Sequence, residues 1–226
     1  MIIAGMATMP SRAATARIAV ASALQFVDRL VLFLDRFDEV PDFARDSKIV
    51  VLRSQDLGDL RANGKLAGVS TASRNDFYIC LDDDIRYPSN FASRLKFFLT
   101  LFPWPAMVGI HGSVFKQQIS SYTRDRRVYV GHHFQRIPRR MDVLATNGCM
   151  FRIRDLKPDV TQWKTVNMVD LSMAESAKAA GVTQYTIPRP RHWIQSLEEI
   201  QQDSIFGALV KNDDQQTARV RALLGR

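Results

Sequence analysis

The first half of the chain alternates between short apolar runs and longer amphipathic segments. The apolar runs predict buried strands over residues 2–8, 29–35, 48–52, 76–83 and 106–112. The amphipathic segments predict helices over residues 11–26, 60–73 and 88–102, the first with Ser11 at its N-cap. Continuous apolar strands that alternate with helices are typical of an α/β sheet covered on both faces. We therefore expect an α/β fold with a mixed, mostly parallel sheet flanked by helices.

The second half, after Gly112, has a less regular pattern. Short strand candidates at residues 127–131, 142–146 and 149–153 predict a β-rich addition to the sheet. Next we expect a helix over residues 170–181, which Gly181 ends, and a strand over 183–187. A loop over 189–196 and an amphipathic C-terminal helix from Asp203 onward should follow. Because no composition change marks a boundary, we expect residues 1–226 to form one domain with two halves, 1–112 and 113–226.

Composition narrows the range of partners. The chain has 226 residues, a net charge of +8 and 46% hydrophobic residues, which suits a protein with a substantial core and anionic ligands. Two cysteines, Cys80 and Cys149, lie in apolar strand candidates and predict free thiols in a reducing compartment. The longest uncharged run is too short to span a bilayer, and the N-terminus lacks the features of a signal peptide. We therefore expect a cytoplasmic protein.

Three adjacent aspartates, Asp82, Asp83 and Asp84, follow the fourth predicted strand. Ligands of open α/β sheets bind beyond the carboxyl ends of the strands. Because side chains alternate along an extended chain, Asp82 and Asp84 share one side and can offer oxygen ligands to Mg²⁺ or Mn²⁺. Asp83 then faces the other way, toward an Arg or Lys. The competing interpretation is a solvated acidic turn that caps the helix beginning near Pro88.

The order of elements and the Asp-x-Asp stretch resemble the GT-A fold glycosyltransferases, most closely the inverting ones. The segment "ATMPSR" is similar to their first nucleotide-contacting loop, and "GDLRANGK" to the loop and helix that close over the nucleotide. The segment "ATNGCMFR" resembles the part beside the acceptor, and "NMVDLSMAESAKAAG" the part that supplies the base, although Val169-Asp170 replaces the usual Glu-Asp pair. The resemblance implies a nucleotide-binding half, 1–112, and an acceptor-binding half, 113–226.

The resemblance also implies a function, namely metal-dependent transfer of a sugar from a nucleotide-diphosphate sugar, with a UDP-sugar favoured, to an acceptor hydroxyl. The nucleotide-binding residues would be Thr8, Pro10, Arg12, Asp35, Arg61, Lys65, Asp82 and Asp83. The metal ligands would be Asp84, Asp82 and His192, and the acceptor side would include Asn147, Gly148 and Trp193. Asp170 would be the general base of the reaction; the alternative is that it caps the helix that begins there. Trp193 could stack on a sugar ring or pack in the core.

Two other functions compete with sugar transfer. A nucleotidyltransferase uses a similar nucleotide-binding sheet, but such enzymes usually begin with a glycine-rich loop, whereas "AGMATMPSR" has one glycine. A non-catalytic nucleotide-binding or nucleic-acid-binding protein would also explain the positive charge. The chain has no aromatic-rich RNA-binding motif, so we expect nucleic acid to be an unlikely partner.

Overall fold

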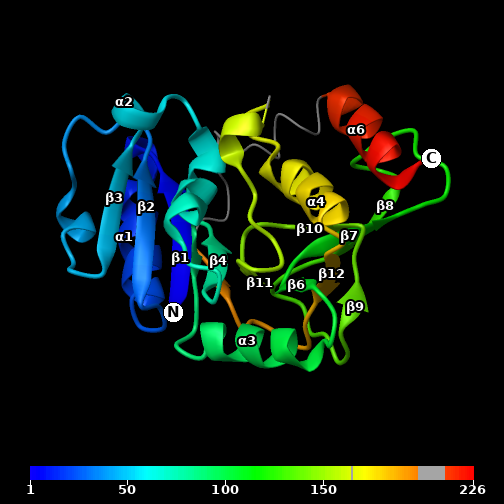
Figure 1. The fold of residues 1–226 in the computed structure, drawn as a ribbon, viewed down its shortest axis with the longest axis horizontal. Coiled ribbons are helices and arrows are strands. Elements are labelled where there is room, and N and C mark those ends of the chain that lie inside the picture. Colours follow the sequence, from blue (N-terminus) through cyan, green and yellow to red (C-terminus); the bar gives the residue numbers. More distant parts are fainter. Residues whose placement is uncertain (164, 198–211) are drawn as a thin grey trace.

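The computed structural model describes residues 1–163, 165–197 and 212–226. Within these residues, the main sheet has eight strands in the order β3-β2-β1-β4-β11-β6-β12-β9 (Figure 1). Along this order the strands are Ile49–Arg53, Arg29–Leu34, Ile2–Thr8, Phe77–Leu81, Cys149–Arg152, Ala106–Gly109, Thr183–Thr186 and Arg139–Arg140. Strands β3, β2, β1 and β4 are parallel, and β6 is parallel to β12, whereas β11 runs antiparallel to both β4 and β6. The fold is therefore the mixed, mostly parallel α/β architecture expected.

Smaller elements complete the fold. A second sheet joins β10 (Val143–Leu144), β7 (Gly112–Phe115) and β8 (Arg126–Tyr129), and a third pairs β13 (Gln195–Ser196) with β5 (Ile85–Arg86). The α-helices are α1 (Ala13–Ala23), α2 (Ser54–Leu57), α3 (Phe91–Leu101), α4 (Val169–Ala179) and α6 (Asp214–Leu224). The 3₁₀ helices are η1 (Pro10–Arg12), η2 (Asp42–Ala44), η3 (Arg61–Thr71) and η4 (Val160–Gln162).

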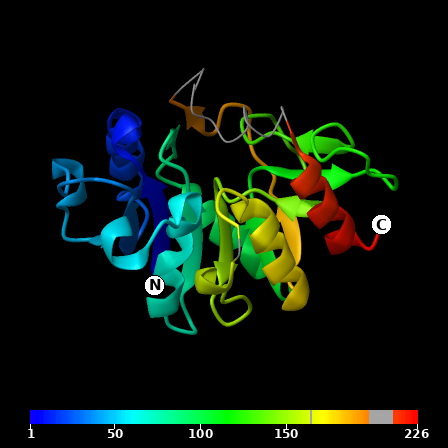
Figure 2. The same cartoon turned by 90° about the horizontal axis from the view of Figure 1, so that it is seen from above.

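Both faces of the main sheet are covered, because alternate side chains of its strands face opposite layers. In β4, Ile79 and Leu81 pack with α1 and α3, whereas Tyr78 and Cys80 pack with η3 and α4. Figure 2 shows α1 on one side of β1, with η3 and α4 on the other. The apolar runs of the sequence are continuous because each strand is buried from both sides.

Glycines let η3 approach the sheet closely. A Cβ atom added to Gly5 of β1 would collide with the backbone carbonyl of Lys65, and one added to Gly64 would collide with the Phe33 ring. The absence of side chains at these two positions allows the backbone of η3 to lie against β1 and β2. This contact places Lys65, a residue in the middle of η3, at the ends of the neighbouring strands.

Several local expectations were wrong. The amphipathic α-helix expected over 60–73 is instead the 3₁₀ helix η3, Arg61–Thr71. Ser11 does not cap α1, which begins after Arg12, and the expected loop 189–196 contains β13. The C-terminal helix begins at Asp214, and residues 203–211 of the expected helix lie outside the described residues. Within the described part of the chain, no helix has the length and apolar character needed to cross a membrane.

Candidate functional site

A pocket of about 260 Å³ opens where β1, β2 and β4 end, and we call it the strand-end pocket. Parallel strands bring their carboxyl ends to one edge of the sheet, where α/β proteins bind ligands. The side chains come from the loops after these strands, from η3 and from the loop before α4. The pocket is lined by Ala7, Thr8, Met9, Arg12, Asp35, Arg36, Arg61, Ala62, Lys65, Asp82, Asp83 and Asn167.

Lys65 and Asp82 form an ion pair at the inner wall of this pocket. The Lys65 side chain is 7% exposed and that of Asp82 is 30% exposed, so the pair lies at the boundary between core and solvent. The Tyr78 hydroxyl donates a 2.8 Å hydrogen bond to the Lys65 carbonyl, which fixes η3 beside β4. Burial alone would lower the pKa of Lys65, but the charge and hydrogen bond of Asp82 raise it above its ordinary value. Lys65 is therefore a permanent cation.

Arg12 holds the other two aspartates. Its guanidinium donates to Asp83 at 2.9 Å and to Asp84 at 3.4 Å. Burial raises the pKa of Asp83 to about 6, and the nearby charge of Arg12 opposes this change. Asp82 and Asp83 therefore contact different cations. This arrangement explains how three adjacent carboxylates, which repel one another, are tolerated at the end of a buried strand. The two cations, one from η3 and one from η1, offset the repulsion.

Asp35 lies at the end of β2 and has a buried carboxylate oxygen without a hydrogen-bond donor. Its Oδ1 makes no hydrogen bond in the described structure, and the nearest cationic atom is Arg36 Nε at 3.9 Å. Burial raises the pKa of Asp35, and Arg36 opposes this effect. Because buried oxygens are almost always hydrogen-bonded, this atom is suited to accept a donor from a ligand.

Three pocket residues have a left-handed backbone, which non-glycine residues seldom adopt. They are Arg36 (φ 57°), Arg61 (φ 46°) and Asn167 (φ 60°). Such strain is concentrated at functional sites, where the surrounding structure holds it in place. The sequence analysis did not single out Arg36 or Asn167, although Asn167 begins the segment "NMVDLSMAESAKAAG". The only local sign was that asparagine tolerates this conformation better than most residues.

The expected metal ligands are not brought together. Among the described residues, no group of three or more His, Cys, Asp or Glu side chains is arranged to hold a metal ion. Asp82 and Asp84 pair with cations, while the backbone N–H of His192 donates to the His132 carbonyl and the two imidazole rings stack. The sequence pattern therefore does not produce a preformed three-ligand cage from Asp82, Asp84 and His192.

Asp170 lies in the first turn of α4 but does not cap it. Its Oδ1 instead accepts hydrogen bonds from the Thr146 backbone N–H at 2.8 Å and the Thr146 hydroxyl at 2.7 Å. Burial raises the pKa of Asp170, while Thr146 and Lys65 oppose the change. The carboxylate lines a separate small cavity of about 70 Å³ beside Asn167. Asp170 thus fixes the loop before β11, and the cap alternative is wrong.

The remaining predicted residues do not line the strand-end pocket. The Asn147 carbonyl accepts from the Tyr87 hydroxyl, which also accepts from the Asp82 backbone N–H, so this loop is tied to the aspartates. Trp193 donates to Asn90 at 3.1 Å and packs on Phe91 at 5.2 Å, an arrangement that holds its ring against the start of α3. Pro10 is the first residue of η1, and Gly148 directly precedes β11.

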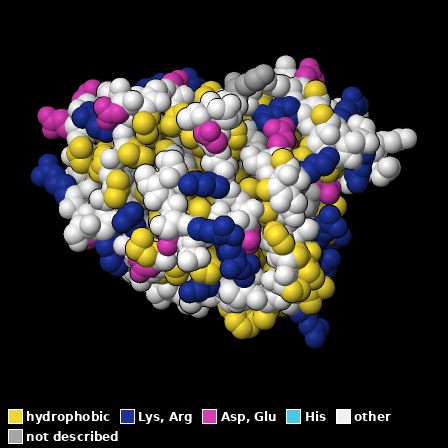
Figure 3. Space-filling model, in the orientation of Figure 1, with side chains coloured by type: hydrophobic (Ala, Val, Ile, Leu, Met, Phe, Trp, Pro, Cys, Tyr) yellow, Lys and Arg dark blue, Asp and Glu magenta, His cyan; other side chains and the backbone are white. Residues whose placement is uncertain are grey.

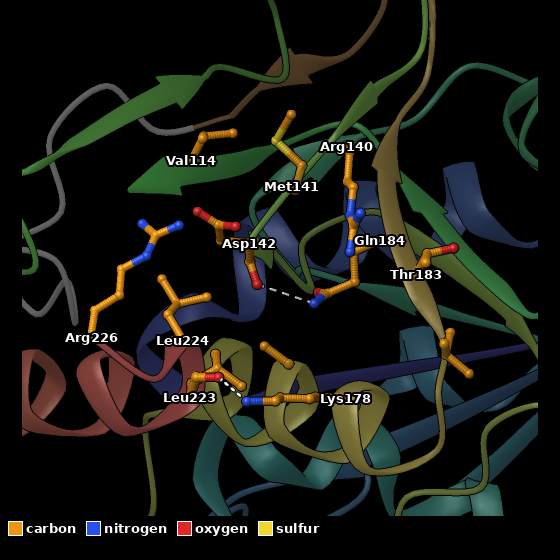
Figure 4. Close-up of a pocket in the computed structure, with 12 residues that line it drawn as sticks. Val114, Arg140, Met141, Asp142, Lys178, Thr183, Gln184, Leu223, Leu224 and Arg226 are labelled. Carbon is orange, nitrogen blue, oxygen red and sulfur yellow. Dashed lines mark hydrogen bonds between the residues drawn. The ribbon is translucent and has the colours of Figure 1, made fainter. Parts of the chain in front are cut away.

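A second cavity, of about 580 Å³, lies between α4, α6 and the strands β7 and β12 (Figure 4). The residues along one side of it already bond to one another. Lys178 donates to the Leu223 carbonyl, and Gln184 donates to the Asp142 carbonyl. None of the residues singled out from the sequence lines this cavity. The strand-end pocket, where seven of them meet, is the better candidate for a functional site.

Comparison with known proteins supports the fold and corrects the function expected from sequence. A nucleotidyl transferase from Methanothermobacter matches with a TM-score of 0.51 and 14% identity, covering 84% of this chain and 88% of that one. A CMP:2-keto-3-deoxy-manno-octonic acid synthetase complexed with CTP matches with a TM-score of 0.53 and 12% identity, covering 96% and 98%. No family model matches the sequence, and no curated protein matches it either.

These two structures contradict the expectation that the chain transfers sugar from a UDP-sugar. One of them is a nucleotidyl transferase by name, and the other is a CMP-sugar-acid synthetase whose structure was determined with CTP. They agree better with the competing function that the sequence analysis ranked second because the first loop has few glycines. With one glycine in that stretch, Arg12 and Met9 after β1 nevertheless line the strand-end pocket. The chain has a Rossmann-like fold similar to that of nucleotidyltransferases.

Proposed function

We propose that the chain binds a nucleoside triphosphate in the strand-end pocket and transfers its nucleotidyl group to an acceptor oxygen. The observation that carries this proposal is the meeting of Arg12, Lys65 and the aspartates in one pocket, with Arg36 and Arg61 at its rim. A triphosphate is a compact polyanion, and such a pocket offers it cations from several elements. The similarity to two nucleotidyltransferase folds supports the same class of reaction.

The reaction would be a displacement at phosphorus. The acceptor oxygen forms a bond to the α-phosphorus while the bond from this phosphorus to the bridging oxygen breaks, and pyrophosphate leaves with the electron pair. Catalysis of phosphoryl chemistry depends mainly on positioning and charge stabilisation. We assign Lys65 and Arg12 to hold phosphate oxygens, with Arg36 and Arg61 at the entrance. The unbonded Oδ1 of Asp35 would accept an N–H of the nucleobase.

A divalent cation fits this site as a companion of the triphosphate. Mg²⁺ is commonly held by one or two carboxylates together with substrate phosphates and water, so no three-residue cage is required. The side chains of Asp82 and Asp84 are 30% and 23% exposed and are the residues that would hold Mg²⁺ or Mn²⁺. When bound, such an ion supplies charge neutralisation to the departing pyrophosphate. Asp170 and Thr146 would keep the neighbouring loop in place for the acceptor.

The experiment measures binding of the four ribonucleoside triphosphates by calorimetry, with Mg²⁺ and with a chelator, and then pyrophosphate release with a panel of acceptors. Arg36→Asn and Arg61→Asn remove cations while keeping a residue that tolerates the left-handed backbone. We expect each variant to bind at least about tenfold more weakly, as for loss of one charge-assisted hydrogen bond. The matched control is Arg45→Asn, at an exposed arginine paired with Asp42.

Three outcomes would contradict the proposal, the first two its binding site and the third its reaction. Absence of triphosphate binding in the presence of Mg²⁺ would reject the pocket as a nucleotide site. If Arg36→Asn and Arg61→Asn bound triphosphate as tightly as wild type, the strand-end pocket would not be the binding site. Tight binding without pyrophosphate release for any acceptor class would instead favour a non-catalytic nucleotide-binding protein.

A further inference from the structure

The outer face of α3 and the turn after it expose large apolar side chains. Phe97 and Leu101 are each 58% exposed, and Trp104 is 47% exposed. Scattered exposed apolar residues are common, but a contiguous group of this size marks an interaction surface. The inner face of α3 is buried in the core through Phe91, Leu95 and other residues, so the outer side chains are not needed to hold the helix.

Ring contacts join these residues to their neighbours in two groups, one on α3 and one in the turn that follows it. Phe97 packs edge-on against Phe98 with ring centroids 5.2 Å apart. Phe102 lies 5.7 Å from Trp104 and stacks on Tyr185 of β12 at 4.4 Å. We call this surface the aromatic patch, and it comprises Phe97, Phe98, Leu101, Phe102, Trp104 and Tyr185.

Cations border the aromatic patch. The Arg94 guanidinium lies 5.6 Å from the Phe98 ring, and Lys96 is exposed on the same helix. Next to Tyr185, the paired strand β9 consists of two exposed arginines. The Arg139 guanidinium lies 5.4 Å from the Tyr129 ring, and Arg140 also lines the second cavity. Figure 3 shows hydrophobic side chains along the lower edge of the molecule, over α3, with Lys or Arg side chains nearby.

Acidic residues are missing from the segments that form this surface. Residues 85–124, 126–141 and 182–197 contain no Asp or Glu. Arg152, which donates to the Leu99 carbonyl near the end of α3, lies 3.4 Å from Asp155, and Arg154 also pairs with that carboxylate. Arg152 and Arg154 are thus neutralised, whereas Arg94, Lys96, Arg139 and Arg140 make no ion pair with the described carboxylates.

A nearby loop has the same character. Phe134 is 65% exposed and Ile137 is 54% exposed, and the Gln135 between them pairs with Arg189. The adjoining Pro188 carbonyl accepts two hydrogen bonds from Arg94 of α3, which brings this loop to the side of the helix. Apolar residues with arginines among them thus extend beyond α3.

We propose that the aromatic patch docks the protein onto the surface of an anionic lipid bilayer. Aromatic rings favour the interfacial region of a bilayer, and adjacent Lys and Arg side chains are attracted by anionic head groups. A second copy of the chain is a poorer occupant, because a two-fold contact through this patch would place one cationic surface against an identical one, and residues 85–124, 126–141 and 182–197 supply no carboxylate to offset the repulsion. Figure 1 shows α3 at the edge opposite the ends of β1 and β2, so the strand-end pocket would face solvent.

The test is co-sedimentation of the full chain with phosphatidylcholine vesicles, with and without phosphatidylglycerol. We expect binding that requires phosphatidylglycerol and weakens with salt. The double variant Phe97→Ser/Trp104→Ser should bind about tenfold more weakly. Arg139→Ser/Arg140→Ser should lose about fivefold for each charge removed. The matched controls are Val50→Ser/Leu57→Ser, at apolar residues 42% and 46% exposed on β3 and α2, and Arg45→Ser/Arg74→Ser, at exposed arginines.

Three results would overturn the proposal. One is the absence of sedimentation with anionic vesicles, and another is an equal loss in the control variants. The third is a concentration-dependent dimer in sedimentation velocity that Phe97→Ser/Trp104→Ser abolishes, which would assign the patch to self-association. If every variant melts at the wild-type temperature, any loss of vesicle binding comes from the substituted surface side chains and not from unfolding of the protein.

Discussion

The hydroxyl of Tyr78 in β4 donates a 2.8 Å hydrogen bond to the backbone carbonyl of Lys65 in η3. This bond connects the strand that ends in Asp82 to the segment that supplies the cation of the Lys65–Asp82 pair. It is buried, and it crosses the close contact that Gly5 permits. The geometry of the strand-end pocket therefore depends on a contact inside the core.

Tyr78→Phe tests this connection. The variant leaves the Lys65 carbonyl buried without a donor, which should lower the free energy of unfolding by about 1–3 kcal/mol. Urea titration followed by circular dichroism measures the change, and triphosphate affinity should fall as η3 loses its anchor. The control Tyr185→Phe removes a hydroxyl for which the described chain shows no hydrogen bond, and it should unfold like wild type. A Tyr78→Phe protein as stable as wild type would show that the bond is not needed.

The Lys65–Asp82 pair should show coupling in a double-mutant cycle. Lys65→Met leaves Asp82 without its partner, and we expect a loss of up to about 3 kcal/mol, moderated because the Asp82 side chain is 30% exposed. Asp82→Asn added to Lys65→Met should recover part of this loss, since no uncompensated charge then remains. Chemical denaturation of the four proteins measures the coupling. Additive losses would mean that the two side chains do not stabilise one another.

Gly64→Ala should displace η3, and with it Lys65, from the strand-end pocket. Its Cβ would meet the Phe33 ring of β2, so η3 must move outward. Overpacking of this kind typically costs about 1–3 kcal/mol, and displacement of Lys65 should weaken triphosphate binding as well. The measurements are thermal melting and calorimetry. As a control, Gly181→Asn changes a glycine with left-handed φ of 68° and no atom within 4 Å of an added Cβ, so it should leave binding unchanged.

Acid sensitivity should arise at Asp213, just before α6. Its Oδ2 accepts hydrogen bonds from the Ser121 hydroxyl, the Thr123 hydroxyl and the Thr123 backbone N–H, at 2.7, 2.7 and 2.8 Å. Burial alone would raise the pKa of Asp213, but these hydrogen bonds lower it to about 2. A folded-state pKa below the ordinary value of 3.8 means that its stabilisation is complete above about pH 4 and is lost as the pH falls through about 2.

Near pH 6, Asp213→Asn should therefore lower the free energy of unfolding by about 1.5–3 kcal/mol, and the variant should melt at a lower temperature than wild type. The difference should shrink as the pH falls below about 4, and thermal melts over a pH series follow it. A difference that stays constant down to the lowest pH at which wild type remains folded would show that the charge of Asp213 is not the cause.

The sequence by itself determined the fold class and most of the elements. Apolar runs such as 29–35 and 76–83 became β2 and β4, because a strand buried on both faces is apolar at successive positions. The amphipathic run from Pro88 became α3, because burial of one helix face leaves its mark on the spacing of apolar residues. It also indicated that Asp82, Asp83 and Asp84 stand at a strand end and need cations. Alternation along the chain predicted that Asp83 faces a basic residue and points away from Asp82 and Asp84. In the structure Asp83 does contact Arg12, but Asp83 and Asp84 lie in a turn after β4 and share that arginine, so the predicted separation of these two side chains is not found.

Only the tertiary structure decided which cation meets which carboxylate. Lys65 reaches Asp82 because Gly5 and Gly64 let a 3₁₀ segment lie against the sheet, and neither glycine is near the aspartates in sequence. The left-handed backbone at Arg36 and Asn167 is likewise imposed by neighbours, so no local pattern identifies these residues. Strand β11 lies between β4 and β6, although 39 residues separate it from the end of β6. Contacts between distant segments depend on how whole layers pack, and the periodicity of a single segment carries no information about its partner.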